Sequence, residues 1–199
     1  KVGFDDFFGY KIHTLTDLSE EEIAAARNVA EQACAAVGLR SVTAHIELMK
    51  TSTGWKIVEL GRRIGGYRQD LYSRAFGINH IMNDVLNRGG EAPIIPKETL
   101  SHAAYFHIYA DKEGIVTAID GIDVVKQLPS FVSLTHDVVI GEFAYFAKHN
   151  GDPVINVILN NSDKQQLLSD IATMEEAIKI HIESESAPAK KLAMAHSDS

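Results

Sequence analysis

Two glutamates, Glu47 and Glu59, have the residue type and spacing that most clearly suggest chemistry in this sequence. They lie in the segments 45–49 and 55–60, where polar and apolar residues alternate as they do along a half-buried β-strand. The intervening residues 51–54 are Thr, Ser, Thr and Gly, which favour a turn. The pattern therefore predicts a β-hairpin with one glutamate on each strand.

The predicted register places the two carboxylates opposite each other. A three-residue loop at 52–54 pairs Glu47 with Glu59 on one face and Leu48 with Val58 on the other. Carboxylates in that position repel each other. Three arrangements relieve the repulsion: both lie in water as ordinary surface residues, one keeps a proton, or a hard cation such as Mg²⁺ binds between them. The pairing by itself leaves all three open.

Arginines and glycines follow directly after the second glutamate. Arg62 and Arg63 precede a Gly65–Gly66 pair. A guanidinium suits a carboxylate or phosphoryl group, and glycines let backbone N–H groups approach an anion. The alternative is a structural loop in which these arginines pair with Glu47 or Asp70. The combination with the facing glutamates favours a site for an anionic ligand.

The elements around the hairpin predict an α+β fold. A capping box, Ser19 with Glu22, begins a helix that ends near Gly38. Two shorter helices are expected at 69–76 and 79–88, before a break rich in glycine and proline.

The remainder of the chain has a different sequence pattern. After Ser101, short β-type runs alternate with turn residues, and no catalytic constellation is evident among them. A last helix is expected from 162 to about 182. We therefore expect a first domain at 1–92, a β-rich subdomain at 93–183 and a disordered tail at 184–199.

Composition narrows the function classes. The 199 residues carry a formal net charge of −8 and are 45% hydrophobic, as in ordinary globular proteins. The acidic balance argues against nucleic acid or an anionic membrane as the main partner. The sequence shows neither a signal peptide nor a run of about 20 apolar residues. With Cys34 as its only cysteine, the protein is expected to be cytoplasmic and to have no internal disulfide.

On these motifs the sequence resembles the C-terminal half of ATP-grasp carboxylate–amine ligases, with amino-acid ligases and biotin-carboxylase-like members as the most similar. The resemblance runs from Leu18–Gly38 through His45–Leu48, is sharpest at Gly54–Gly66, and continues more weakly to about Ile182. It implies the C-terminal part of an ATP-grasp fold, an antiparallel sheet with flanking helices, followed by a smaller β-rich subdomain.

The resemblance also implies roles for individual residues. Glu47 and Glu59 match the glutamates that bind the Mg²⁺ (or Mn²⁺) ions bridging the ATP phosphates. Arg63 matches the motif arginine, which contacts the phosphoryl group or the acyl phosphate. Gly61 stands where many members have a metal-binding Asn, which puts a second metal ion in question.

Three further residues are substrate-side candidates on the same motif. Gly65 and Gly66 match the Gly-Gly turn of the family, and His45 shares the predicted face of Glu47. For His45, a role toward substrate and a purely structural role both stay open.

The implied reaction has two steps: ATP phosphorylates a substrate carboxylate, and an amine then attacks the acyl phosphate to give an amide and phosphate. No Gly-rich phosphate-binding motif of the P-loop or dinucleotide type occurs in the chain. We therefore expect part of a longer ligase that is inactive alone. Its expected partners are ATP, small carboxylate and amine substrates, its own N-terminal half and a second copy in a homodimer. The alternative is a non-catalytic nucleotide-binding or assembly module on a ligase-like scaffold.

Overall fold

The computed structural model describes residues 2–4, 7–96, 98–146 and 152–184, and it divides into two compact units. Unit 1 is drawn from Lys1–His13, Tyr105–Leu159 and Gln165–Ser199, and unit 2 from Thr14–Ala104 and Asn160–Lys164. Each unit is assembled from separate stretches of the chain. The division expected between 92 and 93 stays a prediction, and the tail expected at 184–199 lies, apart from Ser184, outside the described residues.

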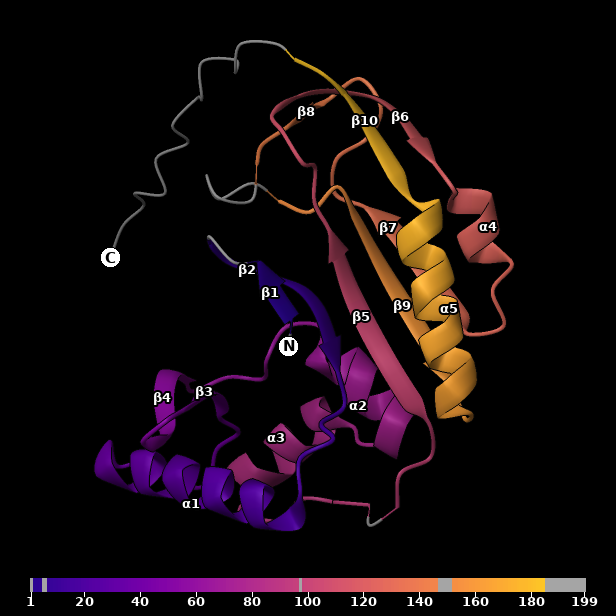
Figure 1. Ribbon diagram of the computed structural model, residues 1–199. Helices are drawn as coiled ribbons and strands as arrows, with labels where there is room; N and C mark the ends of the chain where they lie inside the picture. The colour runs from indigo at the N-terminus through magenta and orange to yellow at the C-terminus, as the bar shows by residue number, and fades with distance from the viewer. Residues whose placement is uncertain (1, 5–6, 97, 147–151, 185–199) are drawn as a thin grey trace. The chain divides into compact units, whose positions relative to one another are not determined.

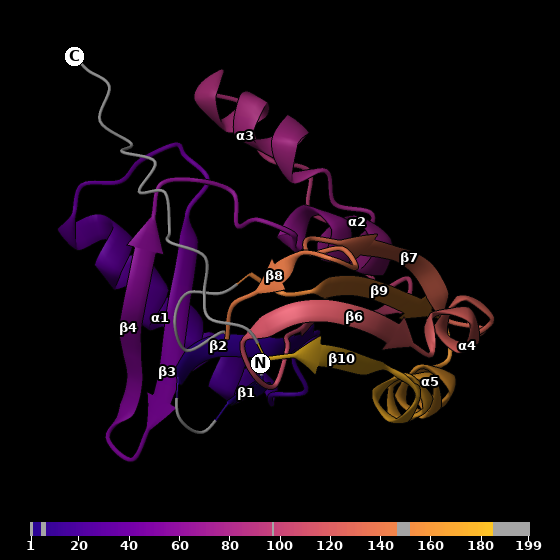
Figure 2. The same cartoon turned by 90° about the horizontal axis from the view of Figure 1, so that it is seen from above.

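Unit 2 contains the hairpin and a helix that covers one of its faces. Helix α1 (Glu20–Ala36) begins at the predicted capping box, in which the Ser19 hydroxyl accepts from the Glu22 N–H and the Glu22 carboxylate accepts from the Ser19 N–H. The helix packs along strands β3 (His45–Thr51) and β4 (Gly54–Gly61) (Figures 1 and 2). An ion pair between Lys50 and Glu22 ties it to the hairpin.

The hairpin register is confirmed at the glutamates and wrong at the turn. Glu47 lies opposite Glu59 as predicted. Thr51, however, pairs with Gly54, so the loop has two residues, and Leu48 lies opposite Ile57 instead of Val58. A β-bulge between the two pairings absorbs the one-residue difference. Gly54 has φ of +102°, a conformation that L side chains rarely adopt.

Two short helices follow the hairpin, as predicted. Helix α2 (Arg68–Phe76) ends at Gly77, which has φ of +70°, and helix α3 (His80–Arg88) begins at Asn79. The Asn79 side chain caps α3 by accepting from the backbone N–H of Met82 at 2.9 Å.

Unit 1 contains most of a five-stranded sheet of order β1-β2-β5-β9-β7. Its strands are β1 (Val2–Phe4), β2 (Phe7–Thr14), β5 (His102–Ile108), β7 (Phe131–His136) and β9 (Ile155–Asn161). Helix α5 (Lys164–Ala177) follows β9 along the chain. Fully or nearly fully buried side chains from the sheet and from this helix form the core: Phe106, Val157, Leu159, Leu167, Ile171 and Met174.

A three-stranded sheet of order β10-β6-β8 completes unit 1. It comprises β6 (Gly114–Asp120), β8 (Phe143–Ala144) and β10 (Lys179–Glu183), with helix α4 (Ile122–Lys126) between β6 and β7. The last helix was expected to reach about 182, but it ends at Ala177, because the next residues pair antiparallel with β6. The mixed α+β fold with antiparallel sheets confirms the expected fold class. None of the described helices is long and apolar enough to cross a lipid bilayer.

Candidate functional site

The site is built on the face of the hairpin where Glu47 and Glu59 oppose each other. Glu47 is largely buried, with 16% of its side chain exposed, whereas Glu59 is 52% exposed. Directly opposed carboxylates destabilise a strand pair unless each is neutralised. A different arginine neutralises each carboxylate here.

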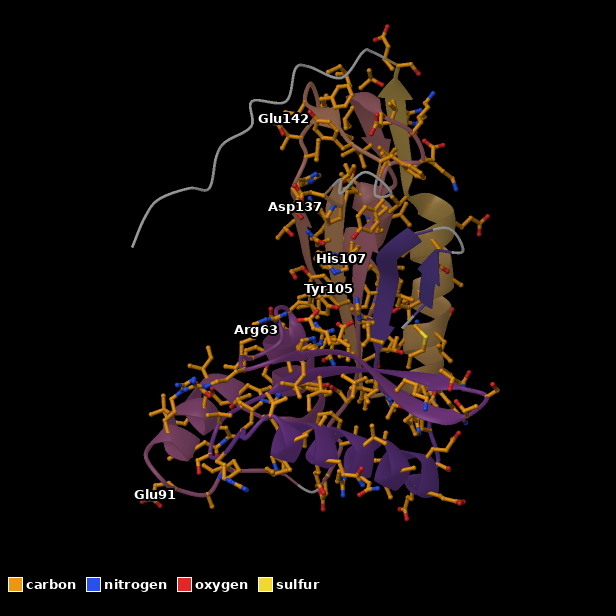
Figure 3. All side chains as sticks on the ribbon, turned by 90° about the vertical axis from the view of Figure 1, so that its left-hand side faces the viewer. Arg63, Glu91, Tyr105, His107, Asp137 and Glu142 are labelled. Atoms are coloured by element: carbon orange, nitrogen blue, oxygen red, sulfur yellow. The ribbon has the colours of Figure 1, made fainter. Side chains whose placement is uncertain are left out.

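Arg63 is the partner of Glu59. Its Nη2 lies 3.0 Å from Glu59 Oε1, and its side chain is 54% exposed. Arg63 is labelled in Figure 3. The loop turns sharply before it, since the Arg63 N–H donates to the Gly61 carbonyl at 2.9 Å. An exposed pair of this kind adds little stability, because water screens both charges. Arg63 is therefore the predicted site residue that can leave its carboxylate most easily.

Arg68 is the partner of Glu47, and the sequence analysis missed it. The first residue of α2, it places Nη2 3.2 Å from Glu47 Oε1, with 16% of its side chain exposed. Its guanidinium carbon also lies 4.9 Å from the centre of the Tyr67 ring, within the range of a cation–π interaction. The structural alternative expected Arg62 or Arg63 to pair with Glu47 or Asp70; the structure shows Arg63 paired with Glu59 and Arg68 paired with Glu47. The only sequence signal was an arginine two residues after the Gly-Gly turn.

His45 shares the carboxylate oxygen that Arg68 binds. The side chain is 9% exposed, and its Nε2 lies 3.2 Å from Glu47 Oε1. Burial, and secondarily the positive charge of Arg68, lower the pKa of His45 below its usual value, although Glu47 opposes this shift. Because a carboxylate only accepts, Nε2 carries the proton that His45 donates to Glu47.

The two glycines of the turn differ in how closely they are surrounded. A Cβ at Gly65 would lie 2.4 Å from Arg68 Cδ and 2.9 Å from His45 Nδ1, so only glycine fits between these side chains. A Cβ at Gly66 would meet nothing within 4 Å. Gly65 therefore has a steric function in the site. For Gly66, no contact explains the residue type.

The donor set fits a magnesium ion that is also bound by a ligand. Among the residues that the structure describes, no group of three or more His, Cys, Asp or Glu side chains is arranged to hold a metal ion. Mg²⁺, by contrast, commonly takes one or two protein carboxylates and completes its shell with water and substrate phosphates. Glu47 and Glu59 supply such a pair. Gly61, opposite His45 in the hairpin, adds no side-chain ligand.

A second polar network lies on the five-stranded sheet, among strands where the sequence analysis found no constellation. His107 Nδ1 is 2.7 Å from Asn156 Oδ1, and Asn156 Nδ2 donates to Asp137 Oδ2 at 2.7 Å. Because a carboxylate only accepts, the amide oxygen of Asn156 faces His107, and His107 Nδ1 must carry a proton. Figure 3 shows Tyr105 beside His107 on β5; the two rings are 4.9 Å apart. The network fixes the imidazole orientation on this face.

A comparison with protein-family models finds a match in the region around this network. Residues 106–183 match the model of the L-amino acid ligase C-terminal domain 2. The matched segment comprises 78 residues and does not include the hairpin. A search of curated proteins finds no match.

Solved structures resemble the chain over most of its length. An L-amino acid ligase from Bacillus licheniformis matches with a TM-score of 0.75 and 21% identity, over 89% of this chain and 45% of that chain. A phosphoribosylglycinamide synthetase from Anaerococcus prevotii matches with a TM-score of 0.68 and 17% identity, over 90% and 48%.

A more distant match is the biotin carboxylase domain of a 2-oxoglutarate carboxylase from Hydrogenobacter thermophilus, solved with MgADP and bicarbonate. Its TM-score is 0.56 and its identity 11%, over 86% of this chain and 39% of that chain. At these identities the likeness concerns the fold. The chain thus spans about half the length of the structures that it matches.

Proposed function

We propose that this chain, which has the fold of the C-terminal half of ATP-grasp proteins and an L-amino acid ligase C-terminal domain, serves an ATP-dependent carboxylate–amine ligase. The proposed reaction forms an acyl phosphate from a small carboxylate and then an amide from an amine. The observation that carries the proposal is the direct opposition of Glu47 and Glu59, each with its own guanidinium.

In the proposed site, Glu47 and Glu59 hold Mg²⁺ or Mn²⁺ together with the phosphates of ATP. The ion supplies charge neutralisation on the phosphates, which is the main requirement of phosphoryl transfer. Arg63 leaves Glu59 and binds the transferring phosphoryl group or the acyl phosphate, which its exposure permits. His45, Gly65 and Gly66 lie on the substrate side, and His45 orients the Glu47 carboxylate.

Nucleotide binding tests this assignment. The full-length protein should bind ADP in the presence of Mg²⁺, and the double variant Glu47→Gln, Glu59→Gln should lose at least tenfold in affinity by isothermal titration calorimetry. A matched control is Glu20→Gln, Glu21→Gln, which removes two exposed charges from the start of α1. Equal ADP affinity in the glutamate double variant and the wild type would contradict the metal site.

We further propose that ligation needs elements beyond this chain, which covers 45% of the Bacillus licheniformis ligase. ATP-dependent amide formation by the 199-residue polypeptide alone would contradict this. Gly61 at the position of the motif Asn supports the second candidate, a non-catalytic nucleotide-binding or assembly module on the same scaffold. Mg²⁺-dependent ADP binding by the full-length protein, without acyl-phosphate formation from any amino acid, would favour that candidate.

A further inference from the structure

The charge balance of the site has a consequence for how ligands enter it. Glu47 and Glu59 contribute two negative charges, and Arg68 and Arg63 contribute two positive charges within 3.2 Å of them. A divalent cation that approaches alone therefore meets a set of groups whose charges already cancel, and it competes with the guanidiniums for the carboxylates.

The two guanidiniums differ in how easily they move. The Arg63–Glu59 pair is more than half exposed, so water can replace either partner. Arg68 is held by Glu47, by the Tyr67 ring and by the close approach of Gly65. Because the Arg68–Glu47 pair is mostly buried, breaking it without a replacement leaves a charge in a poorly solvated place, which is costly.

We propose that Arg68 is a positioning residue that makes the site bind a divalent cation and a polyphosphate together, rather than the cation alone. When both ligands arrive, the cation replaces the guanidinium on Glu47, and the guanidinium takes a phosphate oxygen as its new partner. Both members of the Arg68–Glu47 pair then keep an oppositely charged partner, whereas the cation alone displaces Arg68 from Glu47 without offering its guanidinium an anion. This inference rests on the proposed nucleotide site.

Binding measurements on the full-length protein test the exchange. For the wild type we expect weak Mn²⁺ binding by electron paramagnetic resonance, strengthened at least tenfold when ADP is present. Arg68→Met removes the competing charge, so Mn²⁺ alone should bind about tenfold more tightly, while ADP in the presence of Mn²⁺ should bind about tenfold more weakly. The opposite signs of the two changes are the signature, since a merely structural role would weaken both.

Two further variants sharpen the test. Arg68→Lys keeps the charge and should restore weak binding of Mn²⁺ alone. Arg88→Met removes an equally charged residue that pairs with Asp84 on α3, and it should change neither affinity. A check without metal uses the free energy of unfolding. Arg68→Met should lower this free energy, and adding Glu47→Gln to that variant should recover part of the lost stability.

The outcomes separate this inference from the proposed function. If the wild type binds neither Mn²⁺ nor Mn²⁺ with ADP, the proposed nucleotide site is wrong, and this inference falls with it. If the wild type binds both, but Arg68→Met leaves both affinities unchanged or weakens both, only the role of Arg68 is overturned.

Discussion

At the scale of single residues, the site depends on close contacts around Gly65 and Glu47. One carboxylate oxygen, Glu47 Oε1, accepts from both His45 and Arg68, and Gly65 lies against those two side chains. The charge pairing of Glu47, the orientation of His45 and the packing around Gly65 are therefore coupled. Adding a single methyl group at this position should change all three.

The first prediction is that Gly65→Ala damages the site. The added Cβ would lie 2.4 Å from Arg68 Cδ, so the Arg68 side chain must shift from its present position beside Glu47. Overpacking of this kind costs about 1–3 kcal/mol in the free energy of unfolding, measurable by chemical denaturation. Gly66→Ala is the matched control, since its Cβ meets nothing within 4 Å, and should change stability by less than about 0.5 kcal/mol. Equal effects of the two changes would show that the packing around Gly65 is unimportant.

The second prediction concerns His80, which begins α3. Burial lowers its pKa, its Nε2 is buried without a hydrogen-bond partner among the residues that the structure describes, and its ring lies 5.0 Å from that of Tyr72. The unfolded chain therefore binds a proton more readily than the folded one. Stability should be fully present above the ordinary histidine pKa of about 6.5 and should fall as the pH drops below it.

The measurement is the free energy of unfolding between pH 5 and pH 8. His80→Phe keeps an aromatic ring and removes the titrating group, so its pH dependence should be shallower than that of the wild type. His136→Phe is a control at an exposed histidine. An unchanged slope in the His80 variant would refute the prediction.

At the scale of helices and strands, interactions between residues close in sequence explain which parts of the fold were predictable. The capping box of α1 and the strand pattern of β3 are short-range signals, and the helix start and the strand that they predict were both confirmed. The predicted length of the turn was wrong because Thr51 Oγ1 donates a hydrogen bond to the Gly54 carbonyl and accepts one from the Thr53 N–H. The hydrophobic periodicity of the sequence does not reveal this arrangement. The glutamates still face each other, because the bulge near Val58 restores the register.

Other misses depended on contacts between residues distant in sequence. Arg68 pairs with a residue 21 positions earlier, and this depends on the direction that the loop takes after β4. Strand β10 forms because its backbone pairs antiparallel with the edge of β6. This tertiary pairing overrides the helical sequence pattern that continues from α5. The network of His107, Asn156 and Asp137 likewise joins three separate segments of the chain.

The third prediction tests how α5 is anchored. Asp170 is 3% exposed and accepts from the Ser130 N–H at 2.8 Å and from Gln166 Nε2 at 2.8 Å. Hydrogen bonds to a charged group contribute about 1.5–3 kcal/mol, so Asp170→Ala should cost about that much in denaturant unfolding. Glu176→Ala, at an exposed position of the same helix, is the control. A loss no larger than that of the control would mean that Asp170 does not anchor the helix.

At the scale of the whole molecule, the two lines of support for a ligase concern different parts of the chain. The matched L-amino acid ligase domain covers residues 106–183, mostly in unit 1, whereas the facing glutamates and both arginines lie in unit 2. A test of nucleotide binding must therefore show where the ligand acts as well as that it binds.

The fourth prediction combines stability with location. A ligand present at about 100 times its dissociation constant stabilises the folded state by about 2.7 kcal/mol. For a chain of this size, that raises the melting temperature by roughly 5–10 °C. We expect this shift with ADP and Mg²⁺, a much smaller shift with Mg²⁺ alone because the charges of the site already cancel, and none in the Glu47→Gln, Glu59→Gln variant.

Hydrogen exchange locates the effect. Protection should increase in β3, β4 and the start of α2, because the carboxylates and guanidiniums that change partners lie there. A melting shift with protection confined to residues 106–183 would place the nucleotide elsewhere and leave the glutamate pair without a ligand. If protection of the hairpin requires both Mg²⁺ and ADP, the ligands act at Glu47, Glu59, Arg63 and Arg68. The charge balance of these four side chains would then explain the rise in melting temperature of the whole chain.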